Sequence, residues 1–473
     1  MTGWPAVAIS LVLPWLAVTL WLRLLWTAPF PGRWFMLAGY GYLIAIIAVT
    51  LGLRLQGALG FPLNTSAILL LSTLLVGAAR ILLRRGSLVP PAPAPDRPAM
   101  TPWQSILFAL ILLWLFLRLT GLMLEVWWQP LFPWDAWTTW EYRARTWTEL
   151  RELVPFVSPQ QWLNEPGPAW YNIDAWNYPL TVSLIATWPA LAYGAWSETA
   201  ANLPWFGSVL ALAMGFYAQA RQWGASPLTS VLFLWLLLSL PMLNTHVALA
   251  GYADLWLATA LGLGFMAFML WLKEDDWRQG LLAAVLILSL PMIKQEGLVW
   301  ALLFPAALML AKLNKITLAA IALLVITLGI FVWYRGGLDI NPFGLVSVKI
   351  SADLIQLPLL GEIRLVEDTA WEPILKHLFL YGNWHLLIYL AVLALIAAPG
   401  VIWRWPRHSW HRAGAFWALS SLSALYFLFA KTDAYDWALK GTSINRLTLQ
   451  LAPVLLFWSM TVWIGITNRG EPG

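Results

Sequence analysis

The chain has 473 residues, of which 60% are hydrophobic and only 11% are charged; its net charge is +5 and its mean hydropathy +0.70. Soluble domains are roughly half apolar and about a quarter charged, so this composition excludes a soluble globular enzyme and a disordered or fibrous chain. Apolar runs of about 20 residues recur from end to end and predict an all-α polytopic membrane protein. The absence of cysteine excludes disulfides and cysteine-ligated metals.

Residues 1–86 contain three apolar segments, which predict membrane helices over 4–22, 35–53 and 65–83. The first basic residue is Arg23, so the charged start of a signal peptide is missing and we expect an uncleaved helix. Residues 87–101 are rich in proline and predict a semi-rigid cytoplasmic linker.

The remaining chain predicts a catalytic membrane module over 102–335, a second outer loop over 336–378, and C-terminal membrane helices over 379–473. The module includes a long polar and aromatic outer loop at 125–176, in which we expect amphipathic interfacial helices. In total we expect about 12–14 membrane helices. After the linker, the predicted apolar segments are 102–124, 177–195, 202–220, 227–244, 253–272, 280–293, 297–311, 316–334, 379–399, 414–430 and 446–466.

The basic residues are spread over short loops, so they favour membrane orientation signals over nucleic-acid binding. Arg84 places the linker in the cytoplasm and the 125–176 loop outside, while Arg404 marks a cytoplasmic loop near the other end. Counting from the two ends disagrees by one crossing between residues 177 and 202. We therefore predict that this segment, which contains Pro189, does not make one simple crossing.

The first motif is the stretch 132–145 in the outer loop, which reads FPWDAWTTWEYRAR. Helical spacing predicts one apolar face and a set of charged residues away from it. Asp135 begins this helix and has two interpretations: a helix N-cap, or a carboxylate at the membrane surface that takes a proton from an acceptor hydroxyl. The apolar face comprises Trp137, Trp140, Ala144 and Trp147, and the charged residues elsewhere are Glu141, Arg145, Glu149 and Glu152.

Two further motifs combine polar residues with a helix entry. Tyr178 precedes a proline at the start of one apolar run, which is typical of an ordinary helix start. Asp254 begins another apolar run. An ionisable group so close to an apolar span is costly and suggests a function. The alternative is that Asp254 caps the helix. His246 is more often a hydrogen-bonding residue at a helix end than a ligand. Asp135, Asp254 and His246 have the ligand types for a divalent metal ion but not the spacing of a metal motif.

Basic residues mark two predicted outer turns. Lys294 and Glu296 interrupt an apolar stretch, either as a polar turn or as a source of positive charge for a phosphate. Arg446 begins the last span on the outer side, either as a snorkelling side chain or as a phosphate ligand. The sequence has no P-loop, no dinucleotide-binding glycine motif, no H-E-x-x-H and no G-x-S-x-G.

The order of these motifs resembles that of the GT-C glycosyltransferases. The acid in the first large outer loop, the Tyr-Pro helix entry, the helix-start Asp254 and the Lys-x-Glu-Gly turn at 294–297 carry the resemblance. The pattern looks most like the dolichyl-phosphate-mannose protein mannosyltransferases and the bacterial lipid A aminoarabinose transferases. It covers about 102–335 and the segment 443–446, and each motif alone is unspecific. The family often has paired acids in the first loop, whereas here Asp135 is followed by Ala136.

The resemblance implies an inverting transfer of a sugar from a polyprenyl-phosphate donor to an acceptor hydroxyl on a lipid, glycan or protein. It implies a bacterial inner membrane protein with its active face outside, and leaves the cofactor open, with a divalent metal as one option. By resemblance Asp135 matches the general base and Asp254 the second acid. The further candidates are Glu141 as a catalytic acid and, for substrate or phosphate, Lys294, Glu296, Arg446, Arg143, Tyr178, Trp137 and Trp140.

Two other functions stay open from the sequence. A secondary transporter needs ionisable residues near the membrane midplane and inverted repeats, and neither is evident in the sequence. A non-catalytic membrane assembly partner would use the loops only for binding. Tryptophan is unusually frequent at 35 residues, nine of them between 127 and 176. Most of these predict an aromatic belt at the interface, while Trp137 and Trp140 are candidates for stacking on a sugar.

Overall fold

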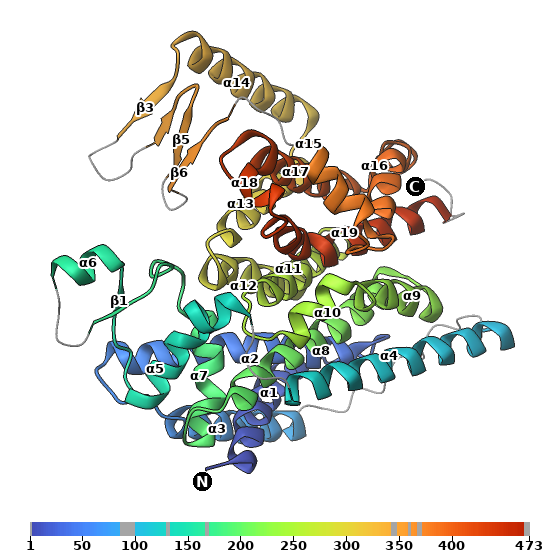
Figure 1. Cartoon of the computed structure of the whole chain (residues 1–473). Coiled ribbons are helices and arrows are strands. Elements are labelled where there is room, and N and C mark those ends of the chain that lie inside the picture. Colours follow the sequence, from blue (N-terminus) through green and yellow to red (C-terminus); the bar gives the residue numbers. More distant parts are fainter. Residues whose placement is uncertain are drawn as a thin grey trace. The chain divides into compact units, whose positions relative to one another are not determined.

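The computed structural model describes residues 2–85, 100–128, 133–165, 170–341, 348–357, 361–366 and 371–467. Nearly all of the predicted linker 87–101 lies outside them. Within the described residues, ten helices are long and apolar enough to cross a membrane. The chain is therefore an all-α polytopic integral membrane protein, as predicted (Figure 1). The ten are α1 (Trp4–Leu25), α2 (Arg33–Ala58), α3 (Ser66–Arg85), α4 (Pro102–Trp128), α8 (Glu198–Trp223), α11 (Asp254–Glu274), α14 (Lys315–Tyr334), α16 (Leu387–Arg404), α17 (Ser409–Lys431) and α19 (Ile444–Thr467).

Shorter apolar helices complete the set. α9 (Pro227–Leu238) and α10 (Pro241–Ala248) form one pair bent by 64°, and the short helices are α7 (Thr181–Tyr193), α12 (Trp277–Ile293) and α13 (Gly297–Lys312). The described residues thus contain ten candidate spans, or 11 with the bent pair, which is fewer than the 12–14 membrane helices predicted. The 13 residues of α7 rise only about 20 Å, less than the roughly 30 Å of a hydrocarbon core. This length agrees with the prediction that 177–202 does not make one simple crossing.

Helix starts follow local side-chain chemistry. Ser197, Ser226 and Asn314 stand just before α8, α9 and α14, and each side chain accepts a hydrogen bond from a backbone N–H in the first turn. Proline occupies the first turn of α9 and α10, where the missing N–H costs nothing. The helices thus begin where the sequence supplies caps.

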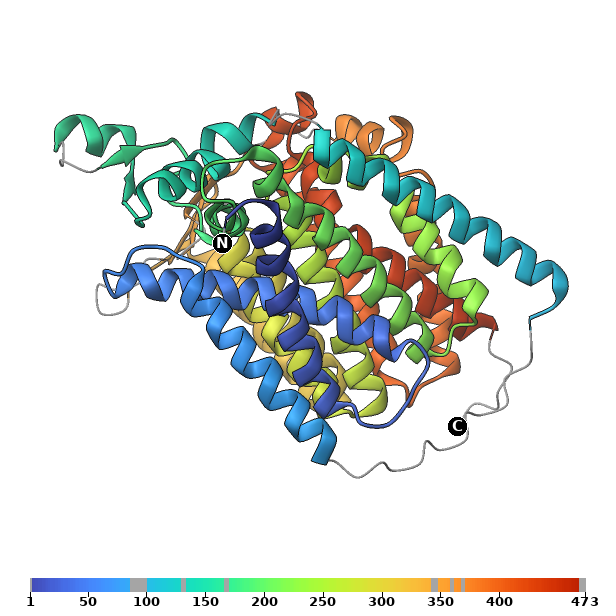
Figure 2. The same ribbon diagram turned by 90° about the horizontal axis from the view of Figure 1, so that it is seen from below.

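The chain divides into two compact units. Unit 1 comprises Met1–Trp271 and Asp276–Lys294, and unit 2 comprises Leu272–Asp275 and Gln295–Gly473. This division runs through the predicted 102–335 module, after Lys294. In unit 1 the N-terminal helices pack on later ones: α2 lies along α8, and α1 lies along α7 (Figure 2).

The segment 125–176 of unit 1, which we predicted to be an outer loop, is folded onto these helices. It contains η1 (Ala136–Trp140), α5 (Glu141–Leu150), α6 (Pro159–Asn164) and the paired parallel strands β1 (Phe156–Val157) and β2 (Tyr171–Asn172). Trp147 of α5 packs in a buried cluster with Leu53 of α2 and with Leu184 and Trp188 of α7. The apolar face of α5 therefore anchors the loop to unit 1.

Unit 2 contains a sheet that the sequence did not predict. Within 336–378, four strands form an antiparallel sheet in chain order, where we expected only a loop. The strands are β3 (Leu338–Ile340), β4 (Val348–Ile350), β5 (Leu354–Leu357) and β6 (Gly361–Arg364). The short helices of the unit are α15 (Trp371–Leu375), η3 (Lys376–Leu380) and α18 (Tyr435–Leu439), and α13 and α19 both pack on α17.

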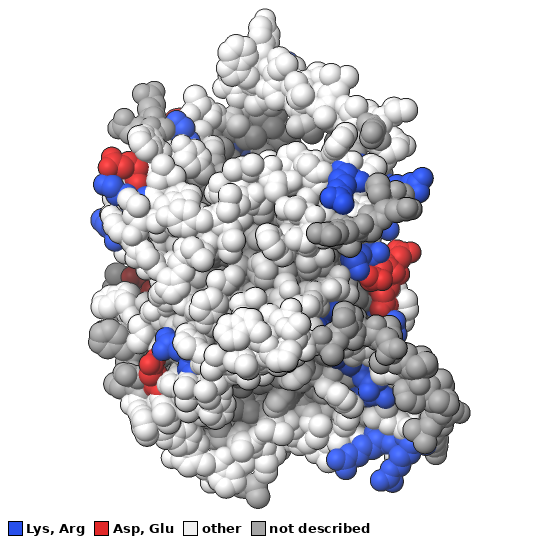
Figure 3. Space-filling view, turned by 90° about the vertical axis from the view of Figure 1, so that its right-hand side faces the viewer, with Lys and Arg blue, Asp and Glu red and all other residues white. Residues whose placement is uncertain are grey.

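Much of the surface is apolar, as a lipid environment requires. Most of the face in Figure 3 consists of uncharged residues. Within the chain, only 17% of the most apolar window of α4 is buried, and none of that of α14. These two helices therefore present large apolar faces to their surroundings.

Candidate functional site

The helical segment after Asp135 begins with a π-turn. Ala136–Trp140 form a π-helix in which the Glu141 N–H donates to the Ala136 carbonyl, five residues back. The wider turn changes the helical register, so the predicted face is partly wrong. Trp140, Ala144 and Trp147 are buried as predicted, but Trp137 is 51% exposed. Glu141, which we placed away from the apolar face, is fully buried because of the same register change.

Glu141 is the most unusual side chain of this segment. It has no exposed surface, and neither carboxylate oxygen has a hydrogen-bond partner within the described residues. Burial, and secondarily the neighbouring charge of Glu198, raises the pKa of Glu141 well above its ordinary value. A buried carboxyl with no partner is expensive to maintain, which makes it a functional candidate.

Gly251 brings two of the predicted motifs together. Its φ of +104° is a conformation that side-chain-bearing residues rarely adopt. A Cβ added there would lie 2.4 Å from the Ala136 Cβ and 2.9 Å from a Glu141 carboxylate oxygen. Only glycine therefore allows the turn before α11 to pack against the π-turn, and this contact joins the Asp135 segment to the segment that leads to Asp254.

Asp254 and Lys294 form a buried ion pair in unit 1. Lys294 Nζ lies 2.9 Å from Asp254 Oδ1, and the two side chains are 5% and 0% exposed. Asp254 is the first residue of α11 and Lys294 directly follows α12. The sequence singled out both residues but not their pairing. Removing one member of such a buried pair is strongly destabilising, because the charge of the other loses its nearest opposite charge.

Arg143 holds the Tyr-Pro helix entry in place. Its guanidinium donates three hydrogen bonds of 2.7–2.9 Å to the backbone carbonyls of Ala175, Trp176 and Tyr178. The side chain is fully buried, and burial lowers its pKa to about 10. We predicted that Arg143 binds a substrate phosphate. Both of its Nη groups, however, donate hydrogen bonds to backbone carbonyls. We therefore assign Arg143 the role of positioning the loop.

The aromatic candidates separate into core and surface. Trp140 is buried and packs edge to face on Tyr178, with ring centroids 5.4 Å apart. Its environment is that of a core residue, so a sugar has no open face to stack on there. Trp137 is half-exposed and lies edge to face with Trp134 at 5.1 Å. Trp137 is thus the better candidate for contact with a substrate.

Asp135 lies immediately before η1. Its side chain is half-buried, and it makes no capping hydrogen bond to the helix backbone. The capping alternative therefore finds no support in the geometry, and Asp135 is more accessible than Glu141. Asp135 is therefore the carboxylate of this segment that a substrate can reach, whereas Glu141 is enclosed.

No metal geometry links the three candidate ligands. His246 is buried, its Nδ1 lies 2.9 Å from the Met242 carbonyl, and its ring packs on Tyr252. This is the helix-end hydrogen bonding that we gave as the alternative. Across the described ranges, no group of three or more His, Cys, Asp or Glu side chains comes together. Asp135, Asp254 and His246 therefore do not fit a shared metal site, and we assign no chemical step to a metal.

Glu296 and Arg446 belong to unit 2. Glu296 directly precedes α13, makes no capping hydrogen bond and is half-buried. Arg446 lies in the first turn of α19 and is half-buried, beside Asn445, whose side chain contacts His377 Nδ1 at 3.2 Å. The predicted phosphate-binding pair of Lys294 and Arg446 is thus divided between the two units.

The roles of Gly251 and Glu198 were not predicted from the sequence. Gly251 stands in the stretch AGYAD just before the helix start, and Glu198 is in the first turn of α8 behind its Ser197 cap. A glycine at such a turn is a usable signal, whereas nothing local marks Glu198 as the neighbour of another carboxylate.

Unit 1 therefore brings together a half-exposed carboxylate, a buried carboxyl and a buried ion pair, all at helix starts or ends. Comparison with family models, curated proteins and solved structures gives no match for this chain. The resemblance to GT-C enzymes accordingly remains a hypothesis from the sequence. The geometry provides a half-exposed carboxylate, Asp135, and an enclosed carboxyl, Glu141, on one short segment.

Proposed function

We propose that the protein is a membrane glycosyltransferase. It would move a sugar from a polyprenyl-phosphate donor to an acceptor hydroxyl at the outer face of a bacterial inner membrane, with inversion. The observation that supports this most is the unpartnered buried Glu141, packed with the Asp135 segment against the turn before Asp254. Ionisable groups at the ends of apolar helices suit a lipid-linked donor that arrives through the bilayer. An enzyme that uses such a donor needs no nucleotide-binding fold.

The proposed reaction is a single displacement at the anomeric carbon. The acceptor oxygen forms a bond to this carbon while the bond from the carbon to the phosphate oxygen breaks, and the phosphate leaves with the electron pair. Asp135 takes the proton of the acceptor hydroxyl, which is otherwise a weak nucleophile. Lys294, held by Asp254, offers positive charge as the phosphate leaves. Glu141 does not contact the substrate; it positions the Asp135 segment against the turn at Gly251.

The test is sugar transfer by the purified chain in lipid nanodiscs. Radiolabelled polyprenyl-phosphate mannose and polyprenyl-phosphate aminoarabinose serve as donors, and label is followed into the lipid, glycan and protein fractions of bacterial membranes. We expect transfer by the wild type and its loss in Asp135→Asn. Asp174→Asn is the matched control, because Asp174 is an exposed carboxylate of the same outer loop. Full activity in both Asp135→Asn and Asp254→Asn would refute the site.

The outward orientation is a separate part of the proposal. The chain has no cysteine, so one introduced cysteine is the only site for a thiol reagent. We expect a cysteine at Ser197, before α8, to react with an impermeant reagent from the outside of intact cells. Labelling only from the cytoplasmic side would refute this topology.

A secondary transporter is the second candidate, and two observations favour it. α9 and α10 form a helix pair broken by 64°, and Arg118 lies within the apolar helix α4. Broken helices and intramembrane charges are features of transporter binding sites. Solute uptake into proteoliposomes, driven by an ion gradient and without sugar transfer, would favour this function over the glycosyltransferase.

A further inference from the structure

Arg118 is the only basic residue of α4, whose sequence is otherwise mostly apolar. Ten residues separate it from the end of the helix at Trp128, about 15 Å along the axis, so its charge lies within the apolar span and not at its end. Most of α4 faces away from the rest of the chain. A guanidinium in such a place requires a partner.

The hydrogen-bond partner of Arg118 is Asn244, which lies in α10 just after the break between α9 and α10. The Asn244 side-chain amide donates to the carbonyls of Leu238 and Leu240, at 3.0 and 2.8 Å. These hydrogen bonds satisfy backbone groups at the break and fix the orientation of the amide. Its Oδ1 then accepts a hydrogen bond from Arg118 Nε at 3.1 Å. The break and Arg118 therefore form one structural unit.

A cavity of about 520 Å³ opens at this point, between α4 and the α9–α10 joint. Within the part of the chain that the structure describes, Asn244 is the one hydrogen-bond partner of Arg118. A neutral amide does not neutralise a guanidinium, and no carboxylate is among the lining residues. The cavity is lined by Trp114, Leu117, Arg118, Ser239, Pro241 and Asn244.

We propose that this cavity binds the phosphate group of a membrane lipid. The Arg118 guanidinium favours a phosphate as the ligand, because its two Nη groups can donate hydrogen bonds to two phosphate oxygens at once. Trp114, Leu117 and Pro241 supply an apolar wall for a hydrocarbon chain. A lipid reaches such a site from within the bilayer, whereas a soluble anion would have to cross apolar surroundings. The proposal does not depend on the proposed transfer activity.

The test is lipid binding to the detergent-purified full chain, measured by native mass spectrometry. Phosphatidylglycerol and polyprenyl phosphate are the phosphate-bearing probes, and diacylglycerol is the phosphate-free control. We expect Arg118→Gln to weaken binding of at least one phosphate-bearing lipid tenfold or more, while diacylglycerol binding stays unchanged. Arg80→Gln is the matched control, because Arg80 is an exposed basic residue of the apolar helix α3, and it should bind like the wild type.

A second variant keeps the test decisive if Arg118→Gln fails to fold. Leu117→Trp retains the charge but fills part of the cavity, so we expect it also to weaken binding of the phosphate-bearing lipid. Equal lipid binding by the wild type and by a folded Arg118→Gln would overturn the proposal. Competition by millimolar inorganic phosphate as effective as that by either lipid would overturn the assignment to a lipid.

Discussion

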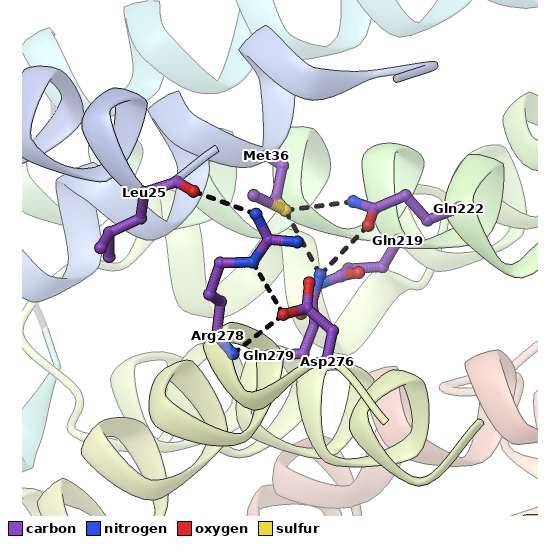
Figure 4. Close-up of polar contacts among 7 residues, drawn as sticks. All are labelled: Leu25, Met36, Gln219, Gln222, Asp276, Arg278 and Gln279. Carbon is purple, nitrogen blue, oxygen red and sulfur yellow. Dashed lines mark hydrogen bonds and ion pairs between the residues drawn. The ribbon is translucent and has the colours of Figure 1, made fainter. Parts of the chain in front are cut away.

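Unit 1 buries polar groups at both ends of α8 and α12, and the two ends differ in kind. At one end lie Glu198 and Lys294, with Glu141 and Asp254 beside them. At the other end, shown in Figure 4, the side chains of Gln219, Gln222 and Gln279 are linked by hydrogen bonds, and Gln222 and Gln279 also contact the sulfur of Met36. One end thus holds ionisable side chains, three of them buried, and the other holds mainly neutral amides.

The glutamine end is linked by amide hydrogen bonds. Gln219 Nε2 donates to Gln279 Oε1, and Gln279 Nε2 donates to Gln222 Oε1, both at 3.1 Å. The nearby charged pair, Asp276 and Arg278, is local and ties the start of α12 to the Leu25 carbonyl (Figure 4). Gln219 Oε1 lacks a hydrogen bond there, which costs much less than an uncompensated charge. This end has the features of a structural connection.

The Glu141 end has the opposite character. Neither oxygen of Glu141 has a hydrogen-bond partner among the described residues, although the π-turn and Gly251 hold the side chain inside. Packing that retains an unfavourable buried group is expected where function requires it. The comparison teaches that burial alone does not identify a site; the distinction lies in whether the buried polar groups satisfy one another.

The largest effect should come from breaking the buried ion pair. Asp254→Ala removes the carboxylate that lies 2.9 Å from the buried Lys294 ammonium, which should lower the free energy of unfolding by about 3–5 kcal/mol. Asp254→Ala combined with Lys294→Met removes both charges and should recover most of this loss without restoring sugar transfer. Thermal unfolding in detergent measures the first effect. A single variant as stable as the wild type would show that the pair does not hold this end together.

The next largest effect concerns the loop clamp. Arg143→Met leaves the carbonyls of residues 175, 176 and 178 without their donor, at a cost of about 2–3 kcal/mol. We expect faster proteolysis within the outer loop and a lower melting temperature. Arg145→Met is the matched control, because Arg145 is exposed and, among the described residues, forms an ion pair only with Glu149. The same protease sensitivity in both variants would contradict a specific role for Arg143.

Glu141→Gln should change stability and activity in opposite directions. The pKa of Glu141 is raised in the folded state, so its contribution to stability is complete below the ordinary glutamate pKa and is lost as pH rises toward the raised value. The variant lacks this dependence, so its melting temperature should exceed that of the wild type increasingly from pH 5 to pH 8. Transfer should fall roughly 100-fold. A constant difference in melting temperature across this pH range would show that the carboxyl does not titrate as described.

The smallest effect should come from the glutamine end. Gln279→Leu removes one amide from the linked set and should lower the free energy of unfolding by about 1 kcal/mol. Because this end has a structural role, the rate of sugar transfer should stay within about twofold of the wild type. If Gln279→Leu lost as much sugar transfer as Glu141→Gln, the claim that only the Glu141 end is functional would be wrong.

The positions of the membrane helices could be predicted from the sequence. Apolar runs placed α1, α2 and α19 to within a few residues, because hydrophobic length is a strong signal in a membrane protein. The segment 336–378 was harder. Its strands have only three or four residues each, too few for a clear alternation, so the sheet from β3 to β6 was missed.

The candidate site was only partly predictable. Asp135, Asp254 and Lys294 stood out because a charge beside an apolar helix is rare. The pairing of Asp254 with Lys294 was within reach, since α11 and α12 have 21 and 17 residues and follow each other closely, which favours a hairpin with meeting ends. The burial of Glu141 was not within reach, because regular helical spacing does not anticipate the π-turn.

The central claim is that the Glu141 end of unit 1 is functional and the glutamine end is structural. The most direct measurement compares initial rates of sugar transfer from a polyprenyl-phosphate donor by the wild type, Glu141→Gln and Gln279→Leu in the same nanodiscs. We predict a roughly 100-fold loss for Glu141→Gln and nearly unchanged transfer for Gln279→Leu. Wild-type rates in a folded Glu141→Gln, or no transfer by the wild type from any donor of the panel, would contradict the claim.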